Sequence, residues 1–120
     1  MASGTIPLSS RVKMDLLWTN SSPSSNFAPQ NIPVDLSAYD YYAVHCRFGA
    51  SYNRLLPIAI YPVDDATNQV SMVALSNNQV GARTFHYVAS TPALVFEEGK
   101  YNGATNNAYA IPVSIYGIKL

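Results

Sequence analysis

The chain has 120 residues, of which 48% are hydrophobic and only 12% are charged. This length suits one domain, and the apolar content is sufficient for a single hydrophobic core. Seven basic and seven acidic residues cancel to a net charge of zero, and no Lys/Arg cluster occurs. The electrostatic attraction that dominates nucleic-acid affinity is therefore missing, which excludes a nucleic-acid-binding protein.

Residues 1–12 are small and polar, and we expect a lead-in segment there, followed by a single β domain over residues 13–120. The beginning, MASGTIPLSS, lacks the basic segment and apolar core of a secretory signal, and no run is apolar enough to span a membrane. The single cysteine, Cys46, cannot form an intrachain disulfide. We expect the protein to be made in a cytoplasm and not to insert into a membrane.

Two short runs of alternating apolar residues flank a polar loop over residues 19–31. The loop contains four Ser, three Asn and two Pro, which makes it too polar for a core and too rich in Pro for a helix. A loop of this length in a compact domain is usually functional or disordered. The period of two predicts these inward-facing residues on the flanking strands: Met14, Leu16 and Trp18 before the loop, and Ile32, Val34 and Leu36 after it.

After a turn at residues 37–40, residues 41–48 form the clearest predicted strand. We expect one buried and one wet face. The buried face would hold Tyr42, Val44, Cys46 and Phe48, and the wet face Tyr41, Ala43, His45 and Arg47. After a turn at 49–53, residues 54–61 are apolar on both faces, which indicates a strand covered on both sides, as a partner subunit would cover it. Pro57 indicates an edge position for that strand.

The second half of the chain reads as further strands separated by turns. Residues 69–75 and 82–89 predict a hairpin around the polar tip 76–79, although helical spacing leaves a short helix over 65–75 as an alternative. Residues 93–96 predict a short strand. Asn102-Gly103 is the turn signal within a polar loop over 101–107.

The last predicted strand covers residues 109–119, with Ile111, Val113 and Ile115 on one face and Pro112, Ser114 and Tyr116 on the other. The whole chain then contains seven or eight strands, with turn signals at short intervals. This pattern predicts an all-β fold, either an antiparallel β-sandwich resembling a jelly roll or a small barrel.

No motif for catalysis, metal binding or cofactor binding occurs in the sequence. His45 and His86 lie on the predicted outer faces of strands without a second ligand at metal spacing, and a buried Cys46 would be inert. The carboxylate pairs 64–65 and 97–98 each consist of neighbours that point to opposite faces of a strand. Calcium binding by Asp64, Asp65 and Asn68 would lack the loop pattern of known sites. We therefore predict a non-enzymatic protein without metal or cofactor.

Tyrosines in turns beside Asn and Arg are the most promising binding residues. The aromatic residues Trp18, Tyr42, Phe48, Phe85 and Tyr87 read as core. Exposed Tyr together with Asn and Arg is suited to gripping sugars or other proteins. The candidate ligand-binding residues are Tyr52, Arg54, Tyr101, Asn102 and Asn106.

Two segments of the chain read KMDLLWTNSSPSSNFAPQNIPVDLSAYDYYAV (residues 13–44) and YAIPVSIYGIKL (residues 109–120). They resemble a family of small tail-associated proteins encoded by phages and prophages of Gram-positive bacteria. The resemblance is most specific at residues 13–18, 22–30, 35–40 and 115–119, whereas residues 49–82 do not align. It implies a virion component of the tail tip or fibre, of a kind that is commonly a homotrimer.

We therefore expect a non-enzymatic structural module of a phage virion that acts in assembly, host-surface recognition or both. Its expected partners are further copies of itself, other virion proteins and a host cell-surface glycan. A carbohydrate-binding module and a head decoration protein are the alternatives, and a cell-wall hydrolase is the enzymatic one. Low charge and a strand that is apolar on both faces favour oligomerisation, while exposed Tyr and Asn in turns favour sugar binding.

Overall fold

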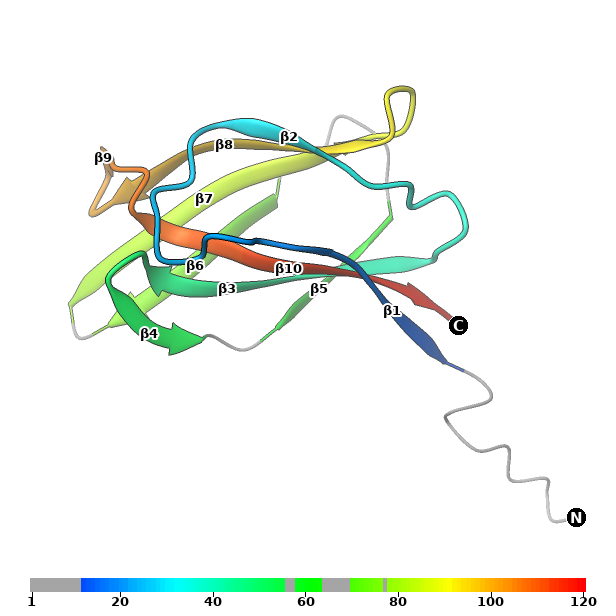
Figure 1. The fold of residues 1–120 in the computed structure, drawn as a ribbon, viewed down its shortest axis with the longest axis horizontal. Coiled ribbons are helices and arrows are strands. Elements are labelled where there is room, and N and C mark those ends of the chain that lie inside the picture. The colour runs from blue at the N-terminus through cyan, green and yellow to red at the C-terminus, as the bar shows by residue number, and fades with distance from the viewer. Residues whose placement is uncertain (1–11, 56–57, 64–69, 77) are drawn as a thin grey trace, which may run out of the picture.

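The computed structural model describes residues 12–55, 58–63, 70–76 and 78–120. These residues form ten strands and no helix. The strands make two five-stranded antiparallel sheets that pack face to face (Figure 1). The predicted all-β fold is therefore confirmed in its sandwich form.

Each sheet combines strands from the beginning and the end of the chain. The first sheet has the order β1-β10-β3-β4, with β5 also paired to β3, and the second has the order β2-β8-β7-β6, with β9 paired to β8. The first sheet contains β1 (Lys13–Thr19), β3 (Tyr41–Gly49), β4 (Tyr52–Leu55), β5 (Ala59–Pro62) and β10 (Tyr109–Lys119). The second contains β2 (Gln30–Pro33), β6 (Val70–Ser76), β7 (Gln79–Val88), β8 (Ala93–Tyr101) and β9 (Ala104–Thr105).

The predicted long loop joins two edge strands of different sheets. β1 is at the edge of the first sheet and β2 at the edge of the second, so residues 20–29 cross from one sheet to the other along one open side of the sandwich. Figure 1 shows this crossing in blue, in front of β10. Phe27, near the middle of the loop, is buried in the core.

The core lies between the two sheets and combines aliphatic side chains with a group of contacting aromatic rings. Phe85 on β7 has its ring centroid 5.2 Å from that of Phe96 on β8 and 5.5 Å from that of Tyr61 on β5. Burying each such side chain stabilises the fold by about 2 kcal/mol. The predicted inward-facing residues that are buried include Ile32, Val34, Leu36, Tyr42, Val44, Cys46, Phe48, Phe85 and Tyr87.

The predicted alternation in the first strand is wrong at two positions. Met14 is 48% exposed and Leu16 is 57% exposed, whereas Leu17 and Trp18 pack against the core. The register between β1 and β10 shifts between Leu16 and Trp18. A bulge of this kind inserts one extra residue, which reverses the faces of the residues on its two sides.

A hydrogen bond explains why Asp15 takes the sheltered side at the start of β1. The Tyr39 hydroxyl donates to Asp15 Oδ2 at 2.7 Å. The Tyr39 ring rests on Gly117, the partner of Asp15 on β10, where an added Cβ would lie 2.7 Å from the ring. The Tyr39 ring therefore fills the space on the core side of β1, where the sequence pattern predicts an apolar side chain of that strand.

The face of β3 that was predicted to be wet is partly buried. Tyr41 is exposed and His45 is partly exposed, as expected, but Ala43 and Arg47 are buried. Arg47 folds over the following turn, where its Nε donates to Tyr52 O at 2.9 Å. Ala43 is too small to rise above its neighbours on the adjacent strands.

Three further predictions need correction. Residues 54–61 do not form one strand but contribute to β4 and β5, which both lie along the edge of β3, so the edge position is confirmed. The strand predicted at 93–96 continues to Tyr101 because β7 and β9 pair with its second half. The helix alternative is wrong over residues 70–75, which belong to β6, and residues 65–69 lie outside the described part.

The last strand has the predicted bounds, but its alternation fails near the middle. Pro112 and Ser114 are buried together with Ile111 and Ile115, while Val113 is partly exposed. The register between β10 and β3 shifts between Pro112 and Ser114. A bulge at Val113 again breaks the period of two.

Arg83 on β7 is completely buried, yet it forms no ion pair within the described residues. Its guanidinium donates to four backbone carbonyls: Glu97 O at 2.8 Å, Ala110 O at 2.8 Å, Tyr109 O at 3.0 Å and Asn107 O at 3.4 Å. It also lies over the Phe27 ring, 5.2 Å from the centroid. Burial lowers the pKa of Arg83 to about 10, so the side chain remains charged at neutral pH.

We predict that Arg83→Met lowers the free energy of unfolding by about 3 kcal/mol, because it leaves buried carbonyls without donors. Lys100→Met is the control, since Lys100 forms an exposed ion pair with Glu98 whose loss costs about 1 kcal/mol or less. Urea unfolding measures both values. An unchanged midpoint for Arg83→Met would contradict the structural role assigned to the guanidinium.

Cys46 is a free, buried thiol, as predicted. Burial raises its pKa from 9.0 to about 12. At neutral pH, its reactive thiolate fraction is therefore roughly a thousandfold lower than that of a thiol with the ordinary pKa. We therefore expect iodoacetamide to label Cys46 at a negligible rate in the native protein and rapidly in urea. Equal labelling rates in the two conditions would show that the thiol is accessible.

Candidate functional site

Three tyrosines meet at the end of the sandwich opposite the C-terminus (Figure 1). Tyr101 at the end of β8 stacks on Tyr109 at the start of β10, with ring centroids 4.1 Å apart and ring planes inclined by 24°. The Tyr52 ring on β4 lies 6.2 Å from that of Tyr109. We call Tyr52, Tyr101 and Tyr109 the tyrosine cluster. It unites two predicted binding residues with one that the sequence analysis missed.

The backbone around the cluster leaves room for its rings. Phe48 supports them from the core side, with its ring centroid 5.0 Å from Tyr52 and 5.3 Å from Tyr109. A Cβ at Gly49 would lie only 3.0 Å from the Tyr52 ring. Tyr52 is 41% exposed, and Tyr101 and Tyr109 are partly exposed. The cluster thus has a buried base and an accessible outer surface.

A left-handed turn brings Tyr101 to this position. Asn102 and Gly103 have φ values of 49° and 88°, which suit the tight turn of a two-residue β-hairpin. The turn joins β8 to β9 and pairs Tyr101 with Ala104. Asn102 Oδ1 also accepts the Val80 N–H at 2.8 Å. The turn signal of the sequence is therefore confirmed.

The other candidate residues differ in what they contribute. Asn102 and Asn106 flank the cluster, but their side-chain oxygens bind backbone N–H groups, that of Asn106 accepting from Ala108 at 3.1 Å. Arg54 belongs to β4, and its side chain lies outside the described part. The structure therefore brings Tyr52 and Tyr101 together and gives both asparagines a role in shaping the loop.

The described charged groups near the cluster are either paired or buried. The guanidiniums of Arg47 and Arg83 are buried and donate to Tyr52 O and Tyr109 O. Lys100 Nζ and Glu98 Oε1 form an ion pair of 2.8 Å, and the Thr105 hydroxyl bonds to Glu98 at 3.2 Å. Desolvation by burial, together with a hydrogen bond to Tyr52, raises the pKa of Tyr109, so this phenol is neutral at physiological pH. The surface can offer stacking and hydrogen bonding through neutral phenols.

The described residues contain no set of three or more His, Cys, Asp or Glu side chains placed to hold a metal ion. His45 and His86 are both partly exposed, and the His86 Nδ1 atom is buried without a hydrogen-bond partner. The suggested calcium ligands Asp64, Asp65 and Asn68 lie outside the described part. In the same part of the chain, no helix is long and apolar enough to cross a membrane.

A second notable surface is the outer side of the first sheet. Leu16 on β1 pairs with Tyr116 on β10, Tyr116 pairs with Ala43 on β3, and Ala43 pairs with Ile60 on β5. A neighbouring row consists of Met14, Ile118, Tyr41 and Pro62. Paired residues share a face of the sheet, so these two rows form one apolar surface, which we call the outer apolar face.

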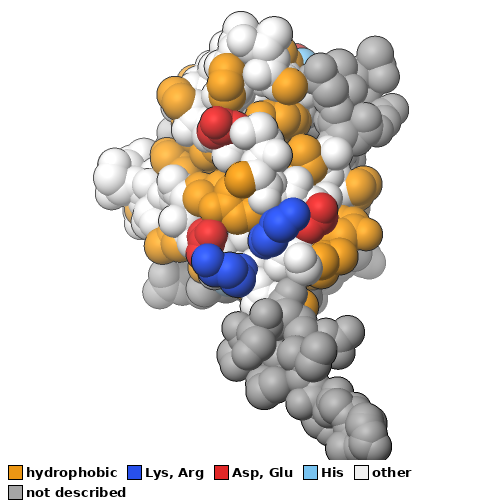
Figure 2. Space-filling view, turned by 90° about the vertical axis from the view of Figure 1, so that its right-hand side faces the viewer, with side chains coloured by type: hydrophobic (Ala, Val, Ile, Leu, Met, Phe, Trp, Pro, Cys, Tyr) orange, Lys and Arg blue, Asp and Glu red, His pale blue; other side chains and the backbone are white. Residues whose placement is uncertain are grey.

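The exposure of the outer apolar face is greatest at the two sheet edges. Leu16 on β1 is 57% exposed and Ile60 on β5 is 60% exposed. Figure 2 looks onto the end of the molecule where β1 begins and β10 ends, and there hydrophobic side chains alternate with basic and acidic ones. Exposed apolar surface of this kind is typical of contacts with other protein chains.

Comparison with protein-family models, curated proteins and solved structures finds no match for the chain. The function is therefore inferred from the surfaces described above and from the sequence resemblance.

Proposed function

We propose that the protein is a non-enzymatic structural module of a phage virion, of the tail-tip or fibre type, that recognises host-surface glycan through the tyrosine cluster. The stacked and accessible Tyr101–Tyr109 pair, with Tyr52 beside it, is the observation that carries this proposal. Tyrosine offers a flat apolar face for the C–H surface of a sugar and a hydroxyl for hydrogen bonding. The resemblance of residues 13–44 and 109–120 supports the assignment to a phage virion.

The chemistry of the nearby carboxylates supports a binding role rather than glycoside hydrolysis. A hydrolytic general acid needs a raised pKa. The hydrogen bond with Lys100 instead lowers the pKa of Glu98. A carbohydrate-binding module outside a virion would use the same tyrosine cluster, and the resemblance favours the virion component.

We predict that Tyr52→Ala and Tyr101→Ala each weaken binding to wall glycan isolated from Gram-positive bacteria by about three- to tenfold, because each removes one aromatic contact. Arg54→Ala should weaken binding as well. The dissociation constant can be measured by biolayer interferometry on immobilised glycan.

Thr91→Ala is the control because Thr91 is exposed in the turn between β7 and β8, away from both the tyrosine cluster and the outer apolar face. Each variant is first compared with the parent by circular dichroism and thermal unfolding. If all three binding-site variants bind the glycan as tightly as the parent, the tyrosine cluster is not the recognition site. A purely structural role would then explain the surface better.

We further propose that the protein assembles as a homotrimer and contacts other virion proteins through the outer apolar face. Its most exposed residues, Leu16 and Ile60, lie on opposite edges of the first sheet. Contact between the β1 edge of one copy and the β5 edge of the next is heterologous, and such contacts can close into a ring. The choice of three copies rests on the resemblance to phage proteins.

We predict that light scattering finds a trimer at micromolar concentration and that Leu16→Ser and Ile60→Ser shift it towards monomer, because each removes exposed apolar surface. Val80→Ser provides the control, since Val80 is exposed on β7 of the other sheet. A monomeric parent protein would overturn self-association. A dimeric parent protein would overturn the proposed trimer. The outer apolar face would then be the dimer interface only if Leu16→Ser and Ile60→Ser dissociate the dimer.

A further inference from the structure

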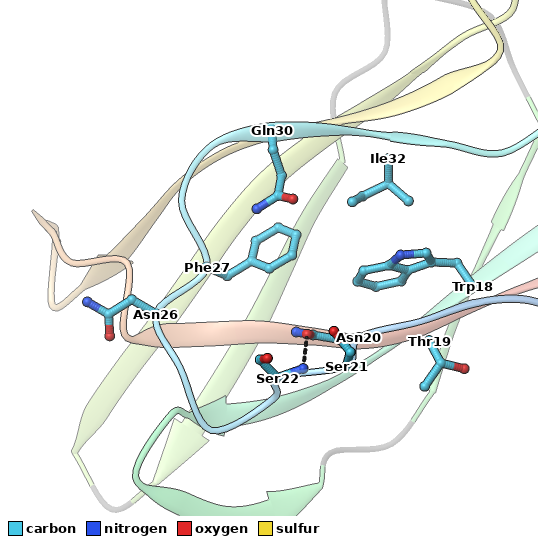
Figure 3. A pocket seen from close by; sticks show the side chains of 9 residues that line it. All are labelled: Trp18, Thr19, Asn20, Ser21, Ser22, Asn26, Phe27, Gln30 and Ile32. Atoms are coloured by element: carbon cyan, nitrogen blue, oxygen red, sulfur yellow. Dashed lines mark hydrogen bonds between the residues drawn. The ribbon is translucent and has the colours of Figure 1, made fainter.

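The loop between β1 and β2 borders an open pocket that the proposed function does not use. Its volume is about 290 Å³. We call it the polar pocket. It is lined by Trp18, Thr19, Asn20, Ser21, Ser22, Asn26, Phe27, Gln30 and Ile32. Figure 3 shows Gln30 and Ile32 entering from β2 and the Trp18 indole facing them from β1, while the Phe27 ring closes one end.

The lining has a chemical composition that differs from the core behind it. It combines hydroxyl and amide side chains with two aromatic rings and one aliphatic residue, and it contains no charged side chain. The rings of Trp18 and Phe27 meet edge to face, with centroids 6.1 Å apart. A neutral ligand with both hydroxyls and C–H groups is complementary to such a lining.

Hydrogen bonds hold the loop in this shape. Asn20 Nδ2 donates to Pro112 O at 2.9 Å, and Asn20 Oδ1 accepts the Ser22 N–H at 2.8 Å, the bond drawn in Figure 3. Gln30 Nε2 donates to Ala28 O at 3.0 Å. At the far side, the Phe27 N–H donates to Asn107 O at 2.9 Å. The pocket is therefore preformed, which lowers the entropic cost of binding.

Several polar groups on the lining have no partner within the protein. In the described part of the chain, no hydrogen bond involves the Trp18 indole N–H, the Ser22 hydroxyl or Gln30 Oε1. Together they offer donors and acceptors around one small space. Polar groups of this kind give a ligand its orientation and its specificity.

We propose that the polar pocket binds a single neutral sugar unit. Its volume is close to the lower limit of about 300 Å³ for ligand pockets, so it accommodates one ring better than a chain of rings. The absence of any cation in the lining disfavours phosphate and carboxylate groups. The site is separate from the tyrosine cluster, and it does not depend on the role proposed there.

Trp18 is the only tryptophan of the chain, so its fluorescence reports directly on the polar pocket. The probes are glucose, galactose, mannose, rhamnose and N-acetylglucosamine at millimolar concentrations. We expect a saturable change in Trp18 emission with at least one of them. Gln30→Ala and Ser22→Ala should each weaken that binding by about tenfold through the loss of a hydrogen bond.

Asn78→Ala serves as the control because Asn78 is an exposed amide next to β7, and it should bind the sugar as the parent does. Tyr52→Ala and Tyr101→Ala should also retain it, so a failed tyrosine site and a failed pocket give different results. Absence of a response to all five sugars, undiminished binding by both pocket variants, or tighter binding of glycerol phosphate or glucuronate would each overturn the proposal.

Discussion

The buried guanidinium of Arg83 joins the two sheets and the loop that crosses between them. It reaches from β7 of the second sheet to the carbonyls of Tyr109 and Ala110 on β10 of the first, and it covers the ring of Phe27. A buried charge without a carboxylate partner is tolerated only where several carbonyl oxygens replace its hydration. Here that requirement dictates the path of the backbone at one end of the sandwich.

The backbone next to Arg83 adopts an unfavourable conformation and a close approach in order to make these contacts. Ala110 has a φ of 51°, a left-handed conformation that costs a non-glycine residue on the order of 1 kcal/mol. Its carbonyl receives the 2.8 Å hydrogen bond from Arg83 Nε, which offsets that cost. A Cβ at Gly99 would lie 2.6 Å from Arg83 Nη2, so only glycine fits there. The tyrosine cluster and the polar pocket both adjoin this region, through Tyr109 and Phe27.

Much of the fold follows from the sequence pattern, because alternation holds wherever a strand pairs without interruption. The faces around Ile32 and Cys46 and the bounds of the last strand are examples. The failures at Leu16 and Val113 occur where bulges shift the register. A bulge depends on the partner strand, which is distant in sequence, so one sequence does not reveal it.

The candidate binding surfaces were harder to predict for related reasons. Tyr52 and Tyr101 were found through turn chemistry, whereas Tyr109 reads as the start of a strand and joins them only through the pairing of β10 with β3. Arg83, Phe85 and Tyr87 are alternate residues of β7 and therefore point to the same side of the strand. This pattern indicates that Arg83 points into the core despite its charge. Phe27, the one aromatic residue in the polar loop, is a comparable signal that the sequence interpretation left unused. In both cases, a residue type that contradicts its surroundings in the sequence marks a contact made across the fold.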